Sequence, residues 1–130
     1  MSDRASLVAD LRRVDPAIDH LGIKIVAVDQ DSVELALTVE PDMANGHGIL
    51  HGGYVFLLAD TALAYCCASL ARMSMTRQAE IAFLAPARVG ARVTAVASVR
   101  AVQGRTTICD VRLEADGVLI AEFRGHGSVV

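Results

Sequence analysis

The spacing of apolar residues predicts a helix and then a β-hairpin at the start of the chain. Residues 3–13 carry apolar side chains at helical spacing, and the pattern stops before Pro16, because a proline keeps the residue before it out of the helical region. Residues 23–28 are rich in β-branched side chains, and apolar and polar positions alternate in residues 32–40. We expect these two segments to pair as antiparallel strands joined by the turn at 29–31.

The longest apolar segment of the chain predicts a helix that is covered by protein. Residues 41–50 show no periodicity and hold several turn-forming residues, so they form a loop before it. Between Tyr54 and Leu70 the one charged side chain is that of Asp60, and a helix that is apolar on all sides has to be buried. The segment approaches the length of a membrane span, about 20 residues, but a carboxylate in its middle opposes insertion. We therefore expect a core helix and no membrane partner.

Further strands are predicted in the second half of the chain, at residues 76–84, 91–102, 105–115 and 118–127. The first of them also fits a helix, but its neighbours need an antiparallel partner, so a strand is favoured. The sum is a single α+β domain over residues 1–130, with an antiparallel sheet wrapped around a long central helix. A sheet of this size leaves part of the helix bare, which predicts a second copy packed on it across a two-fold axis.

Composition narrows the class of protein. Hydrophobic residues make up 53% of the 130 residues and aromatic residues 4%, so the core is expected to consist of aliphatic side chains. The formal net charge of -3 opposes nucleic-acid binding, which rests on neutralising phosphates. The N-terminus lacks the apolar stretch of a secretory signal, and the cysteines are odd in number, with Cys66 and Cys67 adjacent. These features predict a cytoplasmic protein with reduced thiols.

Chemistry is indicated where the chain enters the central helix. Residues 45–53 contain four glycines, and Gly52-Gly53 open the helix. Helix N-termini carry unpaired N–H donors and a partial positive charge, and glycine lets a ligand approach them closely. Such a place suits a carbonyl oxygen that gains negative charge. A glycine pair by itself is equally explained by a tight turn, so this segment does not stand alone as evidence.

Asp60 makes the functional interpretation stronger, because a carboxylate in a buried helix needs a reason. A hydroxyl such as that of Thr61 or Thr76 would satisfy it, and the alternative is a catalytic base or nucleophile. Gly52 and Asp60 are about 12 Å apart along a helix, too far to reach one reacting atom in a single subunit. Two antiparallel helices across a two-fold axis would bring Gly52 of one copy opposite Asp60 of the other. The sequence therefore predicts two shared sites per dimer.

Other chemistries are not supported. His47 and His51 are spaced as metal ligands can be on a helix, but they lie in a glycine-rich loop with no third ligand in the metalloprotease pattern. The loop also lacks the Gly-Lys-Ser/Thr ending of a nucleotide P-loop. Cys66 as a nucleophile is disfavoured by its apolar surroundings, which suppress thiolate formation. No metal and no cofactor are expected.

The segment Asn45-Gly46-His47, followed by His51-Gly52-Gly53 and by Phe56-x-Leu58-Ala59-Asp60-Thr61, resembles the hotdog-fold acyl-CoA thioesterases of the phenylacetic-acid-degradation (PaaI) type. The similarity extends from Leu21-Gly22-Ile23 through Phe83-Leu84-x-Pro86 to Phe123-Arg124-Gly125, most of the chain. The resemblance implies a hotdog fold and a catalytic set. Asp60 would activate water or attack the thioester, and the Gly52 N–H would polarise the carbonyl. His51 and Asn45 would orient the reactants, and the Thr76 hydroxyl would lie near the water.

The same resemblance implies a substrate and an assembly. Substrate contacts are expected at Gly53, Tyr54, Phe56, Thr61, Arg88 and Arg124. Family members often carry a basic residue before the proline, where this chain has Ala85, so the arginines would supply charge to coenzyme A. The expected activity is hydrolysis of phenylacetyl-CoA or a related aryl or medium-chain acyl-CoA, with no cofactor besides the coenzyme A of the substrate. The expected assembly is a homodimer as the minimal active unit, within a homotetramer formed as a dimer of dimers. Alternatives are a hotdog acyl-thioester hydratase or dehydratase, and a non-catalytic acyl-CoA-binding protein.

Overall fold

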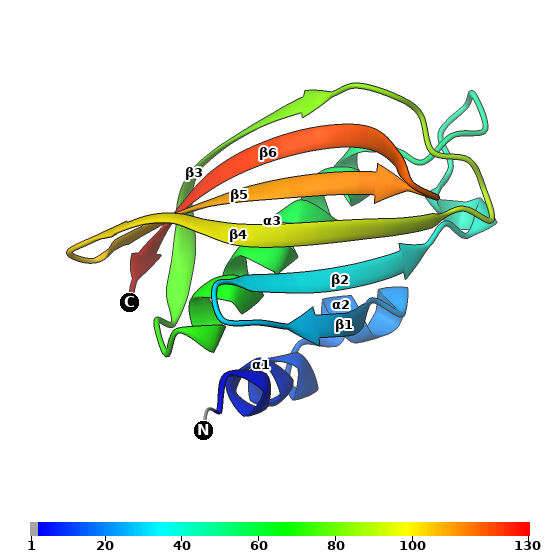
Figure 1. Ribbon diagram of the computed structural model, residues 1–130. Helices are drawn as coiled ribbons and strands as arrows, with labels where there is room; N and C mark the ends of the chain where they lie inside the picture. Colours follow the sequence, from blue (N-terminus) through cyan, green and yellow to red (C-terminus); the bar gives the residue numbers. More distant parts are fainter. Residues whose placement is uncertain (1–2) are drawn as a thin grey trace.

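A six-stranded antiparallel sheet curls around one long helix in the structure, a computed structural model that describes residues 3–130 (Figure 1). The strands follow one another across the sheet in the order β1-β2-β4-β5-β6-β3, so β1 and β3 form its two edges. The elements are α1 (Arg4–Arg13), α2 (Pro16–Leu21), β1 (Lys24–Val28), β2 (Ser32–Thr38), a 3-10 turn (Pro41–Met43), α3 (Gly52–Ser69), β3 (Ser74–Phe83), β4 (Arg92–Gln103), β5 (Thr106–Ala115) and β6 (Val118–Val129).

The predicted fold class is confirmed, and so is the order of two strands, one central helix and four strands. Residues 74–83, for which a helix was the alternative, form a strand that pairs with β6. The second short helix was not predicted. Pro16 ends the first helix but also occupies the first turn of the next one, where its missing N–H costs nothing, and Gly22 closes that helix with a φ of 70°.

α3 lies very close to the concave face of the sheet. Its sheet-facing side chains are fully buried and include Leu58, Ala62 and Leu63. In β6, the backbone of Gly125 passes directly beneath the helix. A Cβ at this position would lie 2.6 Å from Leu63 Cδ2 and 2.8 Å from Phe123 Cε1, so glycine permits the close approach. The cysteines are free and buried at the contact between α3 and the sheet, as predicted for reduced core thiols.

A hydrogen bond joins α3 to Asp15, the residue before α2. The Tyr65 hydroxyl donates to Asp15 Oδ2 at 2.9 Å, and burial together with the Asp15 carboxylate raises the pKa of Tyr65. The Arg12 guanidinium donates to the Ile23 carbonyl, which joins α1 to the start of β1. Val8 of α1 is completely buried. One side of α3 is therefore covered by α1 rather than by the sheet.

One stripe of α3 remains uncovered in the single chain, as expected for a sheet too small to cover the whole helix. Its half-buried or exposed residues lie along one side of the helix: Gly53, Phe56, Leu57, Asp60 and Ala64. The stripe runs beside β3, whose outer edge has no neighbouring strand. α3 is long and apolar enough to span a membrane, but it lies within the curl of the sheet, where a core helix is found. The structure thus has an open helix face and an open strand edge side by side.

We predict that Gly125→Ala lowers the free energy of unfolding by about 1–3 kcal/mol, because the added methyl group meets Leu63 in a packed core. Urea unfolding monitored by circular dichroism measures the difference. Gly46→Ala is the matched control, because a Cβ there has no atom within 4 Å, and its effect should stay within about 0.5 kcal/mol. Equal stability of the two variants would contradict the close packing of helix and sheet.

Candidate active site at the start of helix α3

The loop before α3 is rigidly built. Asn45 Oδ1 accepts hydrogen bonds from the backbone N–H groups of His47 at 2.9 Å and Ile49 at 3.3 Å. Ile49 pairs with Arg88 as an isolated β-bridge, and the Leu50 N–H donates to the Ala87 carbonyl at 2.8 Å. These bonds attach the loop to the segment that follows β3. The loop therefore fixes the position at which α3 begins.

His51 caps the start of α3 with its imidazole and its carbonyl. Its Nδ1 accepts a hydrogen bond from the Gly53 N–H at 3.0 Å, so Nδ1 carries no proton, and its carbonyl accepts from the Tyr54 N–H at 2.9 Å. The Gly52 N–H has no acceptor among the described residues 3–130. The predicted oxyanion donor is therefore a backbone N–H available to a ligand.

A cavity of about 430 Å³ opens beside Gly52. Asn45 contributes the one polar side chain among the described residues that line it. Its carbonyl oxygen is taken by the loop, which leaves its amide NH₂ to donate. The rest of the wall is apolar, from the loop, the first turn of α3, the end of β3 and Ile120 of β6. Two hydrogen-bond donors, Gly52 N–H and the Asn45 amide, thus meet an otherwise apolar space.

Asp60 lies in a different place, within the uncovered stripe of α3 and outside this cavity. It is half-exposed in the single chain, not buried as expected. Its Oδ1 accepts a hydrogen bond from Thr76 Oγ1 of β3 at 2.6 Å. Thr61, the other hydroxyl considered, is buried and donates to the Leu57 carbonyl at 2.7 Å. The second carboxylate oxygen of Asp60 has no partner among the described residues and can accept a proton.

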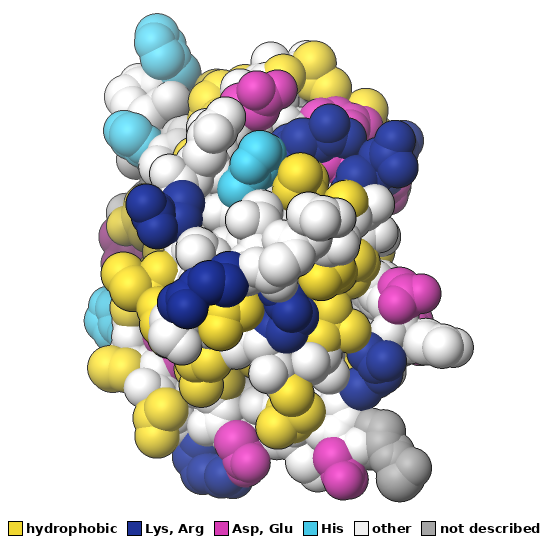
Figure 2. Space-filling model, turned by 90° about the vertical axis from the view of Figure 1, so that its left-hand side faces the viewer, with side chains coloured by type: hydrophobic (Ala, Val, Ile, Leu, Met, Phe, Trp, Pro, Cys, Tyr) yellow, Lys and Arg dark blue, Asp and Glu magenta, His cyan; other side chains and the backbone are white. Residues whose placement is uncertain are grey.

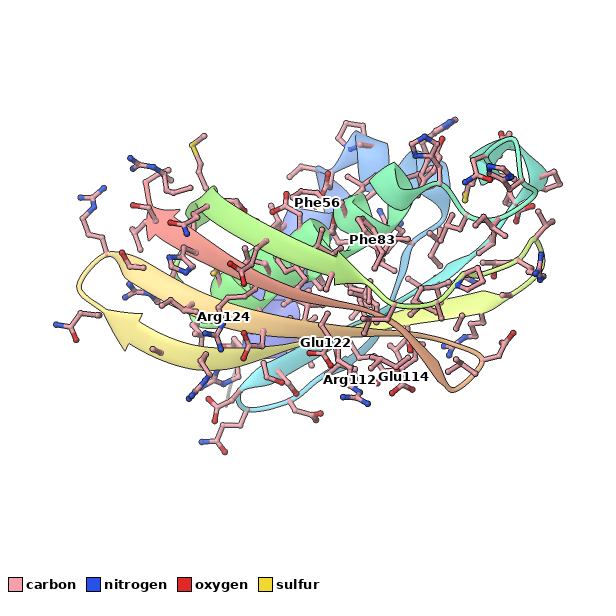
Figure 3. All side chains as sticks on the ribbon, turned by 90° about the horizontal axis from the view of Figure 1, so that it is seen from above. Phe56, Phe83, Arg112, Glu114, Glu122 and Arg124 are labelled. Atoms are coloured by element: carbon pink, nitrogen blue, oxygen red, sulfur yellow. The ribbon has the colours of Figure 1, made fainter. Side chains whose placement is uncertain are left out.

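The residues predicted to contact substrate are dispersed. Gly53 and Phe56 (Figure 3) belong to the open stripe. The Phe56 ring packs edge-to-face on Phe123, with ring centroids 5.4 Å apart. Tyr54 borders a separate cavity of about 360 Å³ that also contains Glu40 and Asp42. Thr61 is buried beneath the helix surface. The structure therefore unites Asn45 and Gly52 in one place and Asp60 and Thr76 in another.

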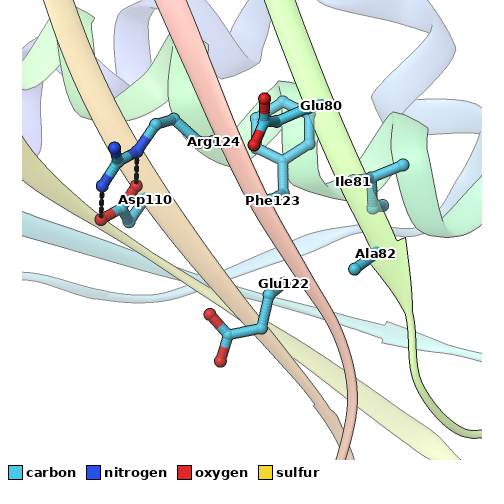
Figure 4. A pocket seen from close by; sticks show the side chains of 7 residues that line it. All are labelled: Glu80, Ile81, Ala82, Asp110, Glu122, Phe123 and Arg124. Carbon is cyan, nitrogen blue, oxygen red and sulfur yellow. Dashed lines mark hydrogen bonds and ion pairs between the residues drawn. The ribbon is translucent and has the colours of Figure 1, made fainter.

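The two predicted arginines differ in their surroundings. Arg88 is exposed next to the loop that forms the cavity wall. Arg124 lies on the outer face of the sheet, where its guanidinium donates to both oxygens of Asp110 at 2.6 and 2.9 Å (Figure 4). It borders another cavity of about 290 Å³ with Glu80 and Glu122. This geometry favours Arg88 over Arg124 for contact with a substrate in the Gly52 cavity.

Basic side chains also gather across one face of the molecule, with the acidic ones nearer its rim (Figure 2). Arg77 borders a cavity of about 400 Å³ together with His126 and Thr106. Arg77 directly follows Thr76 and lies in the irregularity that interrupts the pairing of β3 with β6. It is adjacent to Thr76 in the chain but borders a separate cavity, whose lining does not include Asp60.

Sequence reasoning missed Phe83 as a site residue. The end of its ring lies against Gly52, and the ring lines the cavity. The sequence showed an apolar residue at the end of a predicted strand before Pro86, and no spacing rule connects that position with the first turn of the central helix. The contact depends on the curl of the sheet.

Comparison with known proteins gives consistent results. The thioesterase superfamily profile matches residues 47–121. The chain is 37% identical over 112 residues to the acyl-coenzyme A thioesterase PaaI of Escherichia coli, covering 85% of this chain and 80% of that protein.

Solved structures agree with the sequence match. The PaaI protein from the phenylacetic acid degradation operon of E. coli superposes with a TM-score of 0.95 at 32% identity, covering 98% of this chain and 93% of that one. A variant of the phenylacetic acid degradation protein PaaI from Thermus thermophilus gives 0.85 at 28% identity, over 89% of this chain and all of the other (100%). A thioesterase protein of Streptococcus pneumoniae with coenzyme A, at 22% identity over 83% of this chain and 88% of that one, shares the fold with a TM-score of 0.80.

We predict that Asp110→Asn lowers stability at neutral pH and lowers it less in acid. The Arg124 hydrogen bond holds the pKa of Asp110 below its usual value, so the ionised carboxylate stabilises the fold in full above about pH 3.9, the ordinary value. That contribution decreases below this pH and is lost as the pH falls through the lowered pKa. Because both side chains are more than 40% exposed, we expect the loss at pH 7 to be small. Urea unfolding at pH 7 and pH 3 measures it, and an equal difference at both pH values would contradict the prediction.

Proposed function

The chain belongs to the thioesterase superfamily, and we propose that it hydrolyses acyl-CoA thioesters, with phenylacetyl-CoA or a related aryl or medium-chain acyl-CoA as substrate. The observation that carries the proposal is the Gly52 N–H, which has no acceptor among residues 3–130 and belongs to a residue that lines an apolar cavity at the start of a helix. Thioester hydrolysis needs a nucleophile and a stabiliser for the oxygen that becomes negative, while the thiolate leaves without much acid assistance. The proposed reaction uses water and no cofactor besides the coenzyme A of the substrate.

The Gly52 half of the site would bind the carbonyl. Its N–H belongs to the first turn of α3, where the helix dipole adds partial positive charge. The Asn45 amide offers a second donor from the same cavity wall. His51 acts through the cap that it forms on Gly53, because this bond directs the Gly53 N–H away from the ligand and fixes the first turn. In this proposal, His51 positions the turn and Gly52 contacts the substrate.

The Asp60 half of the site would supply the nucleophile. Thr76 holds Oδ1 of the carboxylate and leaves the other oxygen free for a water proton or for direct attack on the thioester carbon. Both routes use the same geometry. The hydratase alternative requires a histidine paired with an acidic residue, whereas Asp60 bonds to Thr76 and to no histidine among residues 3–130, and His51 Nδ1 accepts from Gly53. The absence of a His–Asp60 pair in the described chain favours hydrolysis.

A homodimer would join the two halves. Phe56 lies midway between Gly52 and Asp60 in the sequence of α3, and the junction of Ala79 and Glu80 lies midway between Thr76 and Phe83 in β3. One two-fold axis through both midpoints would bring Gly52 of one copy to Asp60 of the other, and Phe83 of one to Thr76 of the other. It would also pair the free edges of the two β3 strands, which exposed edge strands readily do. The proposed homotetramer would contain two such dimers.

We predict that Asp60→Asn reduces thiol release from phenylacetyl-, benzoyl- and medium-chain acyl-CoA by at least about 100-fold, because the amide neither attacks nor accepts the water proton. A colorimetric thiol assay measures the rates. Asp29→Asn, an equivalent change in the exposed turn between β1 and β2, should retain full activity. An Asp60→Asn enzyme as fast as the parent would refute the role of Asp60. No turnover by the parent protein would favour an acyl-CoA-binding protein, and water addition to an enoyl thioester would favour a hydratase.

Mixed dimers test the shared site. Gly52→Pro removes the N–H at a helix position where proline is tolerated, and the preceding His51 already has extended backbone angles. We expect Gly52→Pro and Asp60→Asn proteins to be inactive separately, and their mixture, after unfolding and reassembly, to regain about a quarter of the parent activity. Each mixed dimer then contains one site with both groups intact.

Two results would contradict this arrangement. No recovery in the mixture, with mixed dimers shown by mass spectrometry, would place both groups in one chain. Gly52→Ala is the control for the added Cβ, since it meets the Phe83 ring at 3.3 Å as proline does but keeps the N–H. If Gly52→Ala loses as much activity as Gly52→Pro, crowding and not the lost donor explains the effect.

A further inference from the structure

Phe83 occupies an unusual position for a large apolar residue. It is the last residue of the edge strand β3 and is 57% exposed in the chain. The outer end of its ring nevertheless lies against the first turn of α3. A Cβ built on Gly52 would be 3.3 Å from both Cε1 and Cζ of the ring, closer than side chains normally approach. Figure 3 shows Phe83 and Phe56 on the same side of the sheet as α3. The ring is held at the helix start without being part of the core.

The ring also forms a wall of the cavity of about 430 Å³ that contains Gly52 and Asn45. Among the described residues that line this cavity, Phe83 is the one aromatic, and its neighbours Ile49, Val55 and Leu84 are aliphatic. It is also the lining residue that lies against Gly52, whose N–H has no acceptor in the described chain. The free donor and the ring therefore face the same small volume.

The position of the ring bears on a bound acyl group. A carbonyl oxygen that accepts a hydrogen bond from the Gly52 N–H would bring its carbon, and the acyl α-carbon one bond further on, into the cavity that the ring lines. The ring lies so close to the first turn of α3 that even a Cβ on Gly52 would meet it at 3.3 Å. A branch at the acyl α-carbon adds a methyl group near this ring, whereas a methylene group does not.

We propose that Phe83 is a specificity-determining residue that, among acyl groups with a tetrahedral α-carbon, selects those unbranched at this carbon and rejects those branched there. This inference rests on the proposed function and deepens it, because it concerns the shape of the acyl group at the same site. In the proposed dimer the ring lies between Gly52 of its own chain and Thr76 of the other copy. It is therefore next to the reacting atoms.

Butyryl-CoA and isobutyryl-CoA provide a matched test, because they are isomers with nearly equal apolar surface and differ in branching at the α-carbon. We expect the parent enzyme to prefer butyryl-CoA by about tenfold or more in kcat/KM, the size of effect that one misplaced methyl group has in an apolar pocket. Phe83→Ala should reduce the preference to within about threefold, through a gain with isobutyryl-CoA. Phe83→Tyr keeps the ring and should keep the parent preference. Val102→Ala, an exposed residue of β4 outside the cavity, is the control for surface truncation.

An unchanged isomer preference in Phe83→Ala and Phe83→Leu would overturn the proposal, provided circular dichroism shows that at least one of them is folded like the parent. Failure of hydrolysis as the function would appear differently, as no thiol release from either isomer by the parent enzyme. In that case calorimetry gives the ratio of the two dissociation constants for the parent and the variants. A ratio that Phe83→Ala leaves unchanged would overturn the role of Phe83 in binding, and a ratio that moves toward one would support it.

Discussion

Close packing between α3 and the concave face of the sheet determines where chemistry is possible in this molecule. Gly125 lets the sheet approach Leu63 closely, and the helix presents small aliphatic side chains to the strands. The sheet ends at the edge strand β3, so one stripe of α3 stays uncovered. A carboxylate packed between the helix and the sheet would lose its hydration, and burying a charge in this way is costly. Asp60 accordingly lies in the uncovered stripe, at the one side of the helix where a carboxylate reaches both a hydroxyl and an incoming molecule.

The start of the same helix obeys a second constraint, the hydrogen-bond requirement of its first turn. The first N–H groups of a helix have no partner within it. Here the His51 carbonyl takes those of Tyr54 and Val55, and the His51 imidazole takes that of Gly53. The Gly52 N–H has no acceptor among residues 3–130. Any side chain at this position would meet the Phe83 ring, so glycine serves both the backbone approach of a ligand and the packing of the ring.

Sequence reasoning was strongest where periodicity is local. The alternation in residues 32–40 and the long apolar run fixed the strands, the central helix and the α+β class, because burial enforces these periods directly. It was weaker for α2, since a proline both ends one helix and begins another. It left Thr61, Thr76 and a partner helix open as ways to satisfy Asp60, and the structure shows the Thr76 hydroxyl bonded to Asp60 Oδ1 at 2.6 Å.

The rest of the site depends on how distant segments meet. Arg124 resembles a substrate-binding residue in the sequence, but only the register of β5 with β6 reveals that Asp110 lies directly opposite and binds its guanidinium. Phe83 meets Gly52 because the sheet curls, and curling is a property of six strands together. The isolated chain also leaves groups without partners: the Gly52 N–H has no acceptor among residues 3–130, and Phe56 and Phe83 expose apolar surface. In the proposed dimer with substrate bound, the N–H would bond to the thioester oxygen and the rings would pack on the other copy. Substrate binding would satisfy the N–H, and assembly of the dimer would cover the rings. The site would therefore be complete only when both have occurred.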